Sequence, residues 1–519
     1  MRLTAITLAA LLVVPLAGCF GSSAPPRAVA PADVGFDPAS VHVDRVTSAN
    51  YTVASVDAAK LAVIAQVPAT NDTVAGHAPA WPVVIFLHGW GGQKEDYAPQ
   101  LAQFAEAGFI SIAYDARGFG ASQGQTTVAG TIEQSDLGAI IADARVRFPP
   151  TGRIGIVGQS YGGGQALLAW ANNDDVTTVV SQYGWTDLAA GLIPANVPKA
   201  EWAQSLYAYG LVGAKGDYSP MITAWYQQLY TRQDLGTVRK EMLDRSVVGH
   251  MAQVTKPLFA CQGMQESLFP QIDSVWSGAG GFTRAYVYQG GHGGDDPGCW
   301  SRTLDWFEFF LAGFDTRVDS WPALETVDAS GLGGSFVYSS APAAILHPYH
   351  LRGADLYDGP ASDAAFDVKQ TLIGQPASDP SGLWDRAGVP NQFLPDGVRA
   401  DPSTVSFAMP FDGTLIGAPT LRLHQTAGGT PFQVTGQILR LRADGSSQIL
   451  SHAAAAALKA DDVTNGDIAL QFHWVRATFA PGDKIVLRLS SNDESWWMPL
   501  FANYDVTFDG HSTLELPFA

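Results

Sequence analysis

One segment of this sequence reads Arg153-Ile154-Gly155-Ile156-Val157-Gly158-Gln159-Ser160-Tyr161-Gly162, followed by the small residues of 163–168. The apolar run predicts a buried strand, and the small residues predict the start of a helix. Gly-x-Ser-x-Gly between a strand and a helix is typical of a nucleophile elbow, a strained turn on which the serine hydroxyl stands clear of the backbone. The segment therefore predicts that Ser160 is a catalytic nucleophile.

Apolar segments alternate with helical patterns on both sides of this elbow. Such alternation predicts a mostly parallel sheet covered by helices on both faces, the fold of an α/β-hydrolase domain, which we place at residues 36–318. An alternating pattern at 41–67 predicts a leading antiparallel hairpin. The expected strands are residues 82–87, 109–114, 153–157, 176–182, 257–260 and 285–288, and the expected helices are about 97–107, 131–147 and 301–311.

The strand rhythm stops at about residues 186–251, where aromatic residues recur at helical spacing. This pattern predicts a helical cap. Most of its aromatic side chains are expected in the core of the cap, and the alternative is that they line an acyl pocket. From 319 to 519 the chain is rich in Gly, Pro, Thr and Asp, with short alternating runs. That composition predicts an all-β jelly-roll sandwich. A helix-like patch at 453–460 is the exception.

The N-terminus has the pattern of a targeting segment. Arg2 precedes a short apolar core, which ends in Leu16-Ala17-Gly18-Cys19. This arrangement resembles a lipoprotein signal peptide at 1–19, with Cys19 as the lipidated residue after cleavage, or alternatively a plain secretory signal. The Ser/Pro/Ala-rich segment 20–35 is expected to be a flexible tether. These features predict a protein anchored by lipid on the outside of the membrane.

The composition narrows the possible classes of function. With 519 residues the chain is long enough for two domains, and 46% hydrophobic with 15% charged residues indicates a packed globular protein. The net charge of −19 argues against nucleic acid as a partner. No other segment is long and apolar enough to span a membrane.

A catalytic serine needs a base, and the base needs an acid that fixes its tautomer. In α/β-hydrolases the order along the chain is Ser, acid, His. His292, within the glycine-rich residues 289–294, follows the last predicted strand, whereas His88 is expected to be structural. Glu266 follows the preceding strand and is the predicted acid. Asp187 and Asp273 are the alternatives.

The negative oxygen that forms during acyl transfer requires two hydrogen-bond donors. We expect the backbone N–H of Tyr161, directly after the nucleophile, and that of Trp90, in the loop after the first core strand. Asp115 and Arg117 are expected to form a buried structural pair.

Three cysteines occur in the sequence. With Cys19 assigned to lipid, Cys261 and Cys299 remain as an even pair in an oxidising compartment, and they are either a disulfide between two active-site loops or two buried thiols. The Cys and His residues lack the spacing of metal ligands, so neither a metal nor an organic cofactor is expected.

Several motifs together resemble the cocaine esterase / Xaa-Pro dipeptidyl-peptidase family of serine hydrolases. In the first half these are Asp115-x-Arg-Gly-x-Gly-x-Ser-x-Gly124, Gly158-Gln-Ser-Tyr-Gly162, Gly263-x-x-Glu-x-Leu-Phe269 and Gly290-Gly-His-Gly293. In the second half, Tyr349-His-Leu-Arg-Gly353, Gly417-Ala-Pro-Thr-Leu421 and residues 481–491 are similar to the jelly-roll domain of that family. The resemblance covers nearly all of the chain after the signal.

Two departures from the family bear on the substrate. The cocaine esterase type has a tyrosine after the first core strand whose hydroxyl helps to hold the oxyanion, whereas this loop is His88-Gly-Trp-Gly91, and the acid is Glu266 in place of the usual Asp. We therefore predict a hydrolase of esters, amides or short peptides, favouring an esterase or acylase over an Xaa-Pro dipeptidyl-peptidase. The alternative of another class is a non-catalytic lipoprotein that binds a ligand or glycan at the cell surface.

Overall fold

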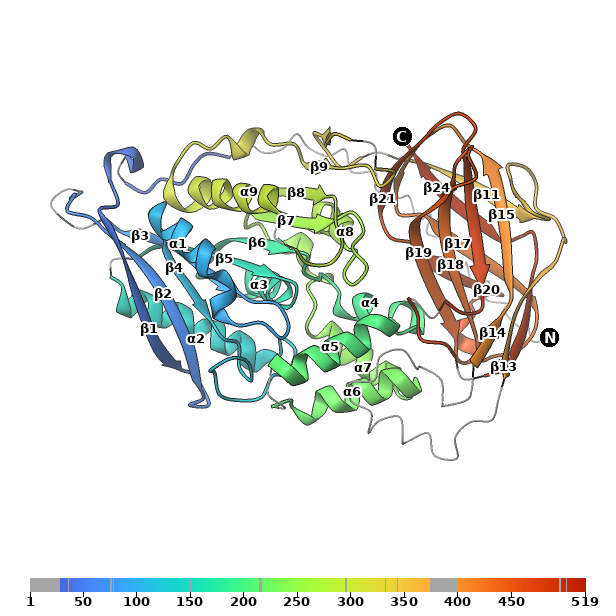
Figure 1. Ribbon diagram of the computed structural model, residues 1–519, viewed down its shortest axis with the longest axis horizontal. Coiled ribbons are helices and arrows are strands. Elements are labelled where there is room, and N and C mark those ends of the chain that lie inside the picture. The colour runs from blue at the N-terminus through green and yellow to red at the C-terminus, as the bar shows by residue number, and fades with distance from the viewer. Residues whose placement is uncertain are drawn as a thin grey trace, which may run out of the picture.

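The computed structural model describes residues 29–35, 37–74, 77, 79–149, 151–213, 217–294, 296–331, 333–342, 344–373, 399–493, 496–500 and 502–519. The predicted signal peptide and Cys19 lie outside these residues. The molecule has an N-terminal α/β domain and a C-terminal β domain, with the cap helices beside both (Figure 1). Within the described residues, no helix is long and apolar enough to cross a membrane.

The first sheet has ten strands within the described residues, in the order β1-β2-β4-β3-β5-β6-β7-β8-β9-β10. β1 and β2 form the predicted antiparallel hairpin, and neighbouring strands from β4 to β9 are parallel. The strands are β1 (Arg45–Ala54), β2 (Lys60–Ala69), β3 (Trp81–Leu87), β4 (Ile110–Tyr114), β5 (Thr151–Gln159), β6 (Val176–Gln182), β7 (Leu258–Gly263), β8 (Thr283–Tyr288), β9 (Leu324–Thr326) and β10 (Phe336–Tyr338).

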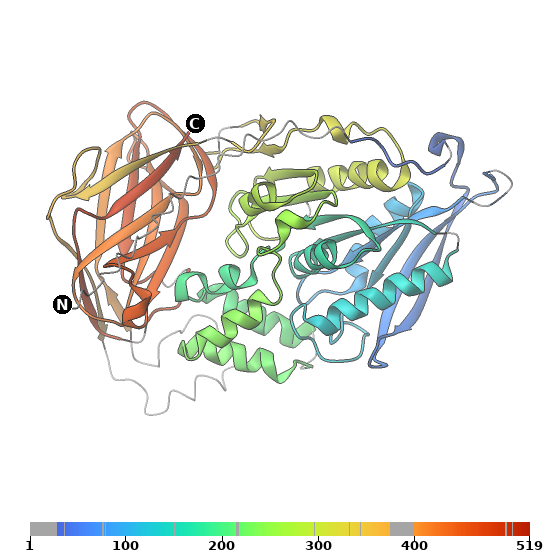
Figure 2. The same cartoon turned by 180° about the vertical axis from the view of Figure 1, so that it is seen from behind.

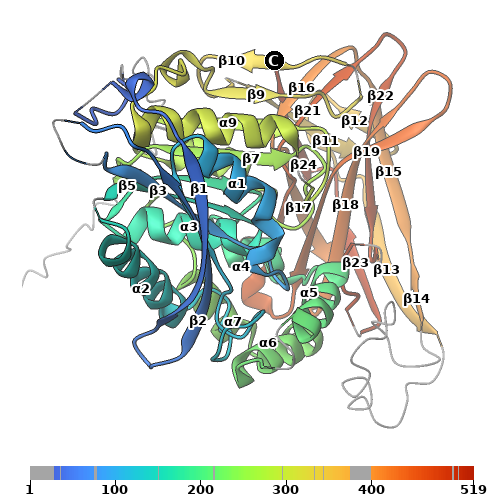
Figure 3. The same ribbon diagram turned by 60° about the vertical axis from the view of Figure 1, so that its left-hand side comes forward.

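Helices cover both faces of this sheet, as the alternating pattern predicts (Figure 3). One core cluster contains side chains of α1 (Ala98–Glu106), α9 (Pro297–Phe307) and the π-helical turn Glu308–Ala312. The other contains side chains of α2 (Thr131–Arg147), α3 (Tyr161–Asn172) and α8 (Ile272–Gly278). Because both faces are buried, the central strands carry apolar residues on both faces.

The cap consists of α4 (Leu188–Leu192), α5 (Ala200–Gly213), α6 (Pro220–Thr231) and α7 (Leu235–Leu243), within the predicted range. These helices lie next to the carboxyl end of the sheet and reach toward the C-terminal domain (Figure 2). Met498 N of that domain donates to Pro198 O at 3.0 Å. The cap therefore contacts both domains.

The C-terminal domain is the predicted all-β unit. Its strands pair antiparallel except for β12 with β15. They are β11 (Ile345–Arg352), β12 (Asp355–Tyr357), β13 (Phe366–Ile373), β14 (Arg399–Pro402), β15 (Thr404–Pro410), β16 (Gly413–Gly417), β17 (Thr420–Ala427), β18 (Phe432–Leu441), β19 (Ser447–Ala457), β20 (Asp467–Gln471), β21 (Val475–Phe479), β22 (Lys484–Ser490), β23 (Tyr504–Phe508) and β24 (Thr513–Phe518).

Three local expectations differ from the structure. The helix prediction at 453–460 is wrong, because its alanines belong to β19, where pairing with β18 and burial outweigh alanine's helix propensity. The first sheet continues through β9 and β10, past the boundary expected at 318. The end of the predicted flexible tether is docked, since Ala32 N donates to Phe309 O at 2.7 Å.

Candidate active site

Ser160 lies at the turn between β5 and α3, with φ 53° and ψ −112°. This left-handed φ is strained for a residue other than glycine. The strain is held by close backbone contacts, because a Cβ on Gly158 would overlap the Gly162 carbonyl and a Cβ on Gly162 would overlap the Leu87 carbonyl. Only glycine fits at either position. The predicted nucleophile elbow is therefore present in the structure.

The structure brings the three predicted side chains together, and we call Ser160, His292 and Glu266 the relay. Ser160 Oγ lies 2.8 Å from His292 Nε2, and His292 Nδ1 lies 2.8 Å from Glu266 Oε2. With hydrogen on Nδ1, the imidazole donates to the carboxylate and accepts the serine hydroxyl proton on Nε2. The Glu266 side chain is fully buried and that of His292 is 9% exposed.

The turn that carries the acid has a dense set of hydrogen bonds. The other oxygen of Glu266, Oε1, accepts from Leu268 N at 2.6 Å and from Phe269 N at 3.1 Å. Gln265 pairs with the histidine loop, donating from N to Gly290 O at 2.8 Å and accepting Gly290 N on Oε1 at 2.9 Å. We define the acid turn as residues 265–269. It fixes both the carboxylate and the loop of its partner.

The two alternative acids take other places. Asp187 is the N-cap of α4, where its carboxylate accepts from Ala190 N at 2.9 Å. Asp273 lies in the first turn of α8, where burial raises the pKa of its carboxyl. Neither carboxylate is hydrogen-bonded to His292.

Aromatic rings surround His292. The rings of Trp202, Tyr183 and Phe269 meet the imidazole edge to face, with centroids at 4.9, 5.2 and 5.7 Å. These contacts restrict the rotation of the ring and exclude water from the relay, which strengthens its electrostatic interactions.

The two expected oxyanion donors flank the serine. Tyr161 is the first residue of α3, and neither its N–H nor that of Trp90 bonds to another group in the described part of the chain. A Cβ on Gly89 would lie 3.7 Å from Ser160 Cβ, so the Trp90 loop passes directly beside the nucleophile. The indole Nε1 of Trp90 donates to Leu206 O at 2.7 Å, which ties the loop to the cap.

His88 is structural in this fold, as expected. Its Nε2 accepts from Ala116 N at 2.9 Å, and its Nδ1 donates to Gly89 O at 2.8 Å. Burial lowers the pKa of the imidazole, so the neutral ring bridges the loops after β3 and β4.

The prediction that Asp115 and Arg117 pair with each other is wrong, because each binds other residues. Asp115 binds Lys94 Nζ at 3.0 Å, and Arg117 binds Asp136 at 2.7 Å and Asp57 at 3.0 Å. All these contacts are structural, but each residue is paired to a different element. Sequence proximity was a poor guide, since the two side chains leave the loop in different directions.

Cys261 and Cys299 form a disulfide with a Cα–Cα distance of 6.1 Å. Cys261 lies in β7, five residues before Glu266, and Cys299 lies in α9, seven residues after His292. The bond therefore links the two segments that hold the base and the acid.

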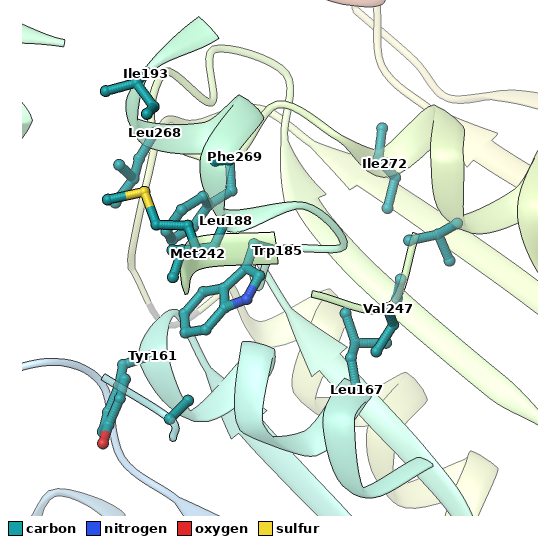
Figure 4. Packing of buried hydrophobic residues seen from close by; sticks show 14 of the residues in the cluster. Tyr161, Leu167, Trp185, Leu188, Ile193, Met242, Val247, Leu268, Phe269 and Ile272 are labelled. Carbon is teal, nitrogen blue, oxygen red and sulfur yellow. The ribbon is translucent and has the colours of Figure 1, made fainter. Parts of the chain in front are cut away.

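A cavity opens beside Ser160 under the cap. Its walls are almost wholly apolar or aromatic, and no charged side chain occurs among the described residues that line it. Leu188, Met242 and Phe269 gather around Trp185 (Figure 4). Further walls come from the cap residues Ala203, Leu206, Tyr207, Ile222, Trp225, Tyr226 and Leu229. Tyr207, Trp225 and Tyr226 of the cap thus line this cavity, which is the alternative that the sequence left open for the cap aromatics.

A metal-ligand type of cluster within the described residues lies elsewhere, at Asp363, Asp509 and His511 of the C-terminal domain. In the relay, the Glu266 carboxylate and the His292 imidazole are hydrogen-bonded to each other. The chemistry available beside the cavity is nucleophilic attack by a serine activated by a histidine.

Sequence reasoning missed two features of this site. One is the pair of backbone amides in the acid turn, which no side-chain motif reports. The other is Lys199, whose Nζ donates to Ser267 O at 2.6 Å and to Leu268 O at 2.7 Å. It lies 67 residues before Glu266 along the chain, so only the fold reveals the contact.

Comparisons with known proteins concern the family and the fold of the chain. Residues 57–294 match the family described as X-Pro dipeptidyl-peptidase (S15 family). A curated relative, an uncharacterised 31.7 kDa protein of the traX-finO intergenic region in Escherichia coli, is 35% identical over 109 residues, which are 20% of this chain and 38% of the relative. The chain thus spans well under half the length of that relative.

Solved structures resemble the whole two-domain chain. A CocE/NonD family hydrolase from Staphylococcus aureus has a TM-score of 0.67 at 14% identity, covering 95% of this chain and 99% of its own. An alpha-amino acid ester hydrolase has a TM-score of 0.64 at 13% identity, covering 91% and 97%. At these identities the likeness concerns the fold, and it includes the C-terminal β domain.

Proposed function

Starting from the match of residues 57–294 to the X-Pro dipeptidyl-peptidase (S15) family, we propose that this chain cleaves carboxylic esters of apolar acids through an acyl-enzyme on Ser160. The observation that carries the proposal is the continuous relay from Ser160 Oγ through His292 to Glu266, with 2.8 Å at both steps. A serine with this activation, beside a water-poor cavity, is equipped for acyl transfer.

In the first half of the proposed reaction, Ser160 Oγ attacks the ester carbonyl while its proton moves to His292 Nε2. Glu266 Oε2 holds the resulting imidazolium through the Nδ1–H bond. The N–H groups of Tyr161 and Trp90 donate hydrogen bonds to the carbonyl oxygen as it becomes negatively charged. The tetrahedral species then collapses, and the alcohol leaves with the proton from Nε2.

The second half repeats these roles with water. His292 Nε2 takes a proton from a water molecule, whose oxygen attacks the acyl carbon on Ser160. Collapse returns the proton to Ser160 Oγ and releases the carboxylic acid. Each cycle therefore consumes one water and restores the resting relay.

The cavity supports an apolar acyl group over a peptide amino terminus. A free ammonium group requires a carboxylate or several acceptors when it leaves water. The described walls of the cavity offer aromatic and aliphatic side chains and no charge. The second candidate is an Xaa-Pro dipeptidyl-peptidase, which the family match favours.

The proposal includes export and lipid anchoring through Cys19. The apolar N-terminal segment and its small residues before Cys19 support it. The disulfide between Cys261 and Cys299 is compatible with an oxidising compartment. Cys19→Ser should move the protein from the membrane fraction to the soluble extract, and an unchanged membrane fraction would contradict the anchor.

The test compares substrates on the chain from Ser23 onward. Nitrophenyl esters from acetate to decanoate and Xaa-Pro nitroanilides are assayed side by side, with Ser160→Ala as control. Ester turnover that disappears in the variant supports the esterase, whereas serine-dependent anilide cleavage would assign the chain to the peptidases. If wild type and variant are equally inactive on both classes, the ligand-binding alternative takes its place.

A further inference from the structure

A buried lysine, Lys199, donates to two backbone carbonyls of the acid turn. Lys199 is 3% exposed, and it forms no ion pair with a carboxylate in the described part of the chain. Burial lowers the pKa of its amine to about 7. Burying an ammonium group without a counter-charge costs several kcal/mol. A lysine at this point therefore needs strong local bonds, which the two carbonyls of the acid turn provide.

Lys199 and Glu266 hold opposite ends of the same two peptide groups. The Ser267 carbonyl and the Leu268 N–H belong to one peptide group, and the Leu268 carbonyl and the Phe269 N–H to the next. Nζ of the lysine donates to both carbonyls at 2.6 and 2.7 Å, while Oε1 of the glutamate accepts both N–H groups at 2.6 and 3.1 Å. Hydrogen bonds in series through an amide polarise one another and become stronger.

We propose that Lys199 is a positioning residue of the proposed reaction, which aligns Glu266 with His292 by fixing and polarising the two peptide groups between them. With Oε1 held by these amides, Oε2 of the carboxylate faces His292 Nδ1. Without the lysine, the carbonyls lose their buried donor, and the turn must move to find another. This inference rests on the proposed function of the relay.

The same lysine connects the acid turn to the C-terminal domain. The backbone of Lys199 forms an isolated bridge with Trp497, and Pro198 O accepts Met498 N at 3.0 Å. Burial lowers the pKa of His452 and His473 of that domain, and the charge of Lys199 lowers it further. Both rings are therefore neutral, and the negative charge of Glu266 opposes the effect of burial on the pKa of Lys199. The C-terminal domain thus contributes to the placement of the acid.

The test begins with Lys199→Met, which keeps the apolar stem and removes the donors. We expect kcat for nitrophenyl butyrate to fall about 10- to 100-fold with KM within about 2-fold of wild type. The matched control is Lys256→Met, because Lys256 Nζ donates to Asn173 O at 2.8 Å, away from the acid turn. An equal loss in the control, or a loss confined to KM, would overturn the inference.

A double-mutant cycle separates positioning from a general loss of structure. If Lys199 acts through Glu266, then Lys199→Met should cost less than about 3-fold in a Glu266→Gln background. The rate at which a fluorophosphonate labels Ser160 measures the reactivity of the serine in each variant, even where turnover is slow. Losses that multiply in the double variant would contradict a role through Glu266.

Two further arms keep the inference testable. If Lys199→Met does not fold, Ser267→Ala removes a neighbouring support of the same turn, the bond from Trp202 Nε1 to Ser267 Oγ at 3.0 Å. It should lower kcat with little change in KM, and an unchanged kcat would count against control through the turn. If wild type hydrolyses no ester, the proposed function fails by itself, and the labelling cycle still decides the role of Lys199.

Discussion

The relay and the cavity lie side by side at Ser160 and differ in almost every physical property. In the relay, the polar atoms of His292 and Glu266 that face the reaction have hydrogen-bond partners at 2.6 to 3.1 Å. The cavity offers apolar and aromatic walls beside the nucleophile. Directional bonds fix the geometry on which a rate depends, whereas an apolar wall discriminates substrates mainly by size. Changes in the relay should therefore alter rates for all substrates, and changes in the cavity should alter the choice among them.

The largest effect is expected from Ser160→Ala, which removes the nucleophile. We expect kcat to fall by about 10⁴-fold or more for every acyl length, because the remaining oxyanion donors cannot replace the covalent step. The measurement is steady-state hydrolysis of the nitrophenyl ester series. A loss that depended on acyl length would contradict the view that the relay sets the rate and the cavity sets the acyl preference.

Glu266→Gln should cause the second largest loss of kcat. The amide keeps the volume but can present its NH₂ group to Nδ1, which disturbs the tautomer that donates to the acid, so kcat should fall on the order of 10³-fold. KM for esters should change little, since Glu266 does not line the cavity. Asp187→Asn is the matched control and should keep kcat within about 2-fold. A comparable loss of kcat in that control would make Asp187 a candidate for the catalytic acid again.

Removal of the disulfide tests whether the relay depends on its covalent support. The bond closes a separation of 38 residues, so Cys261→Ser with Cys299→Ser should lower the free energy of unfolding by about 2 to 4 kcal/mol. Denaturant unfolding measures this loss. Because the bond joins the segments of Glu266 and His292, any loss of kcat should be the same for all esters. A shift in acyl preference would show that the cavity is also held by this bond.

The sequence predicted the relay better than the cavity, because the residues of the relay lie in short sequence patterns that can be recognised locally. Ser160 lies in a strand–turn–helix pattern within ten residues, and the loops of Glu266 and His292 follow apolar strands in the expected order. The cap lacks such markers, because an aromatic at helical spacing can face a core or a cavity with equal ease. Which of these rings line the space depends on how α5, α6 and α7 pack.

The remaining differences have the same origin in long-range contacts. Alanines 453–457 have helix propensity but are strand residues because β18 pairs with them. Arg117 finds Asp136 and Asp57, which lie 19 and 60 residues away, in place of its neighbour Asp115. Lys199 reaches the acid turn from the cap. Such partners are chosen by the folded topology, and a local pattern does not contain them.

The smallest and most selective effect is expected from Ala203→Phe in the cavity. Ala203 lies on α5, is 8% exposed and contributes to the wall, so a phenyl ring there should occupy part of the empty space. We expect kcat/KM for decanoate to fall about 10- to 100-fold relative to acetate, because a filled apolar subsite rejects long chains by about 1 to 3 kcal/mol. Ala203→Ser keeps the size and should leave the acyl preference within about 3-fold of wild type. An equal loss for acetate and decanoate in Ala203→Phe would mean that the ring disturbs the relay, and the cavity would then not be an independent acyl subsite.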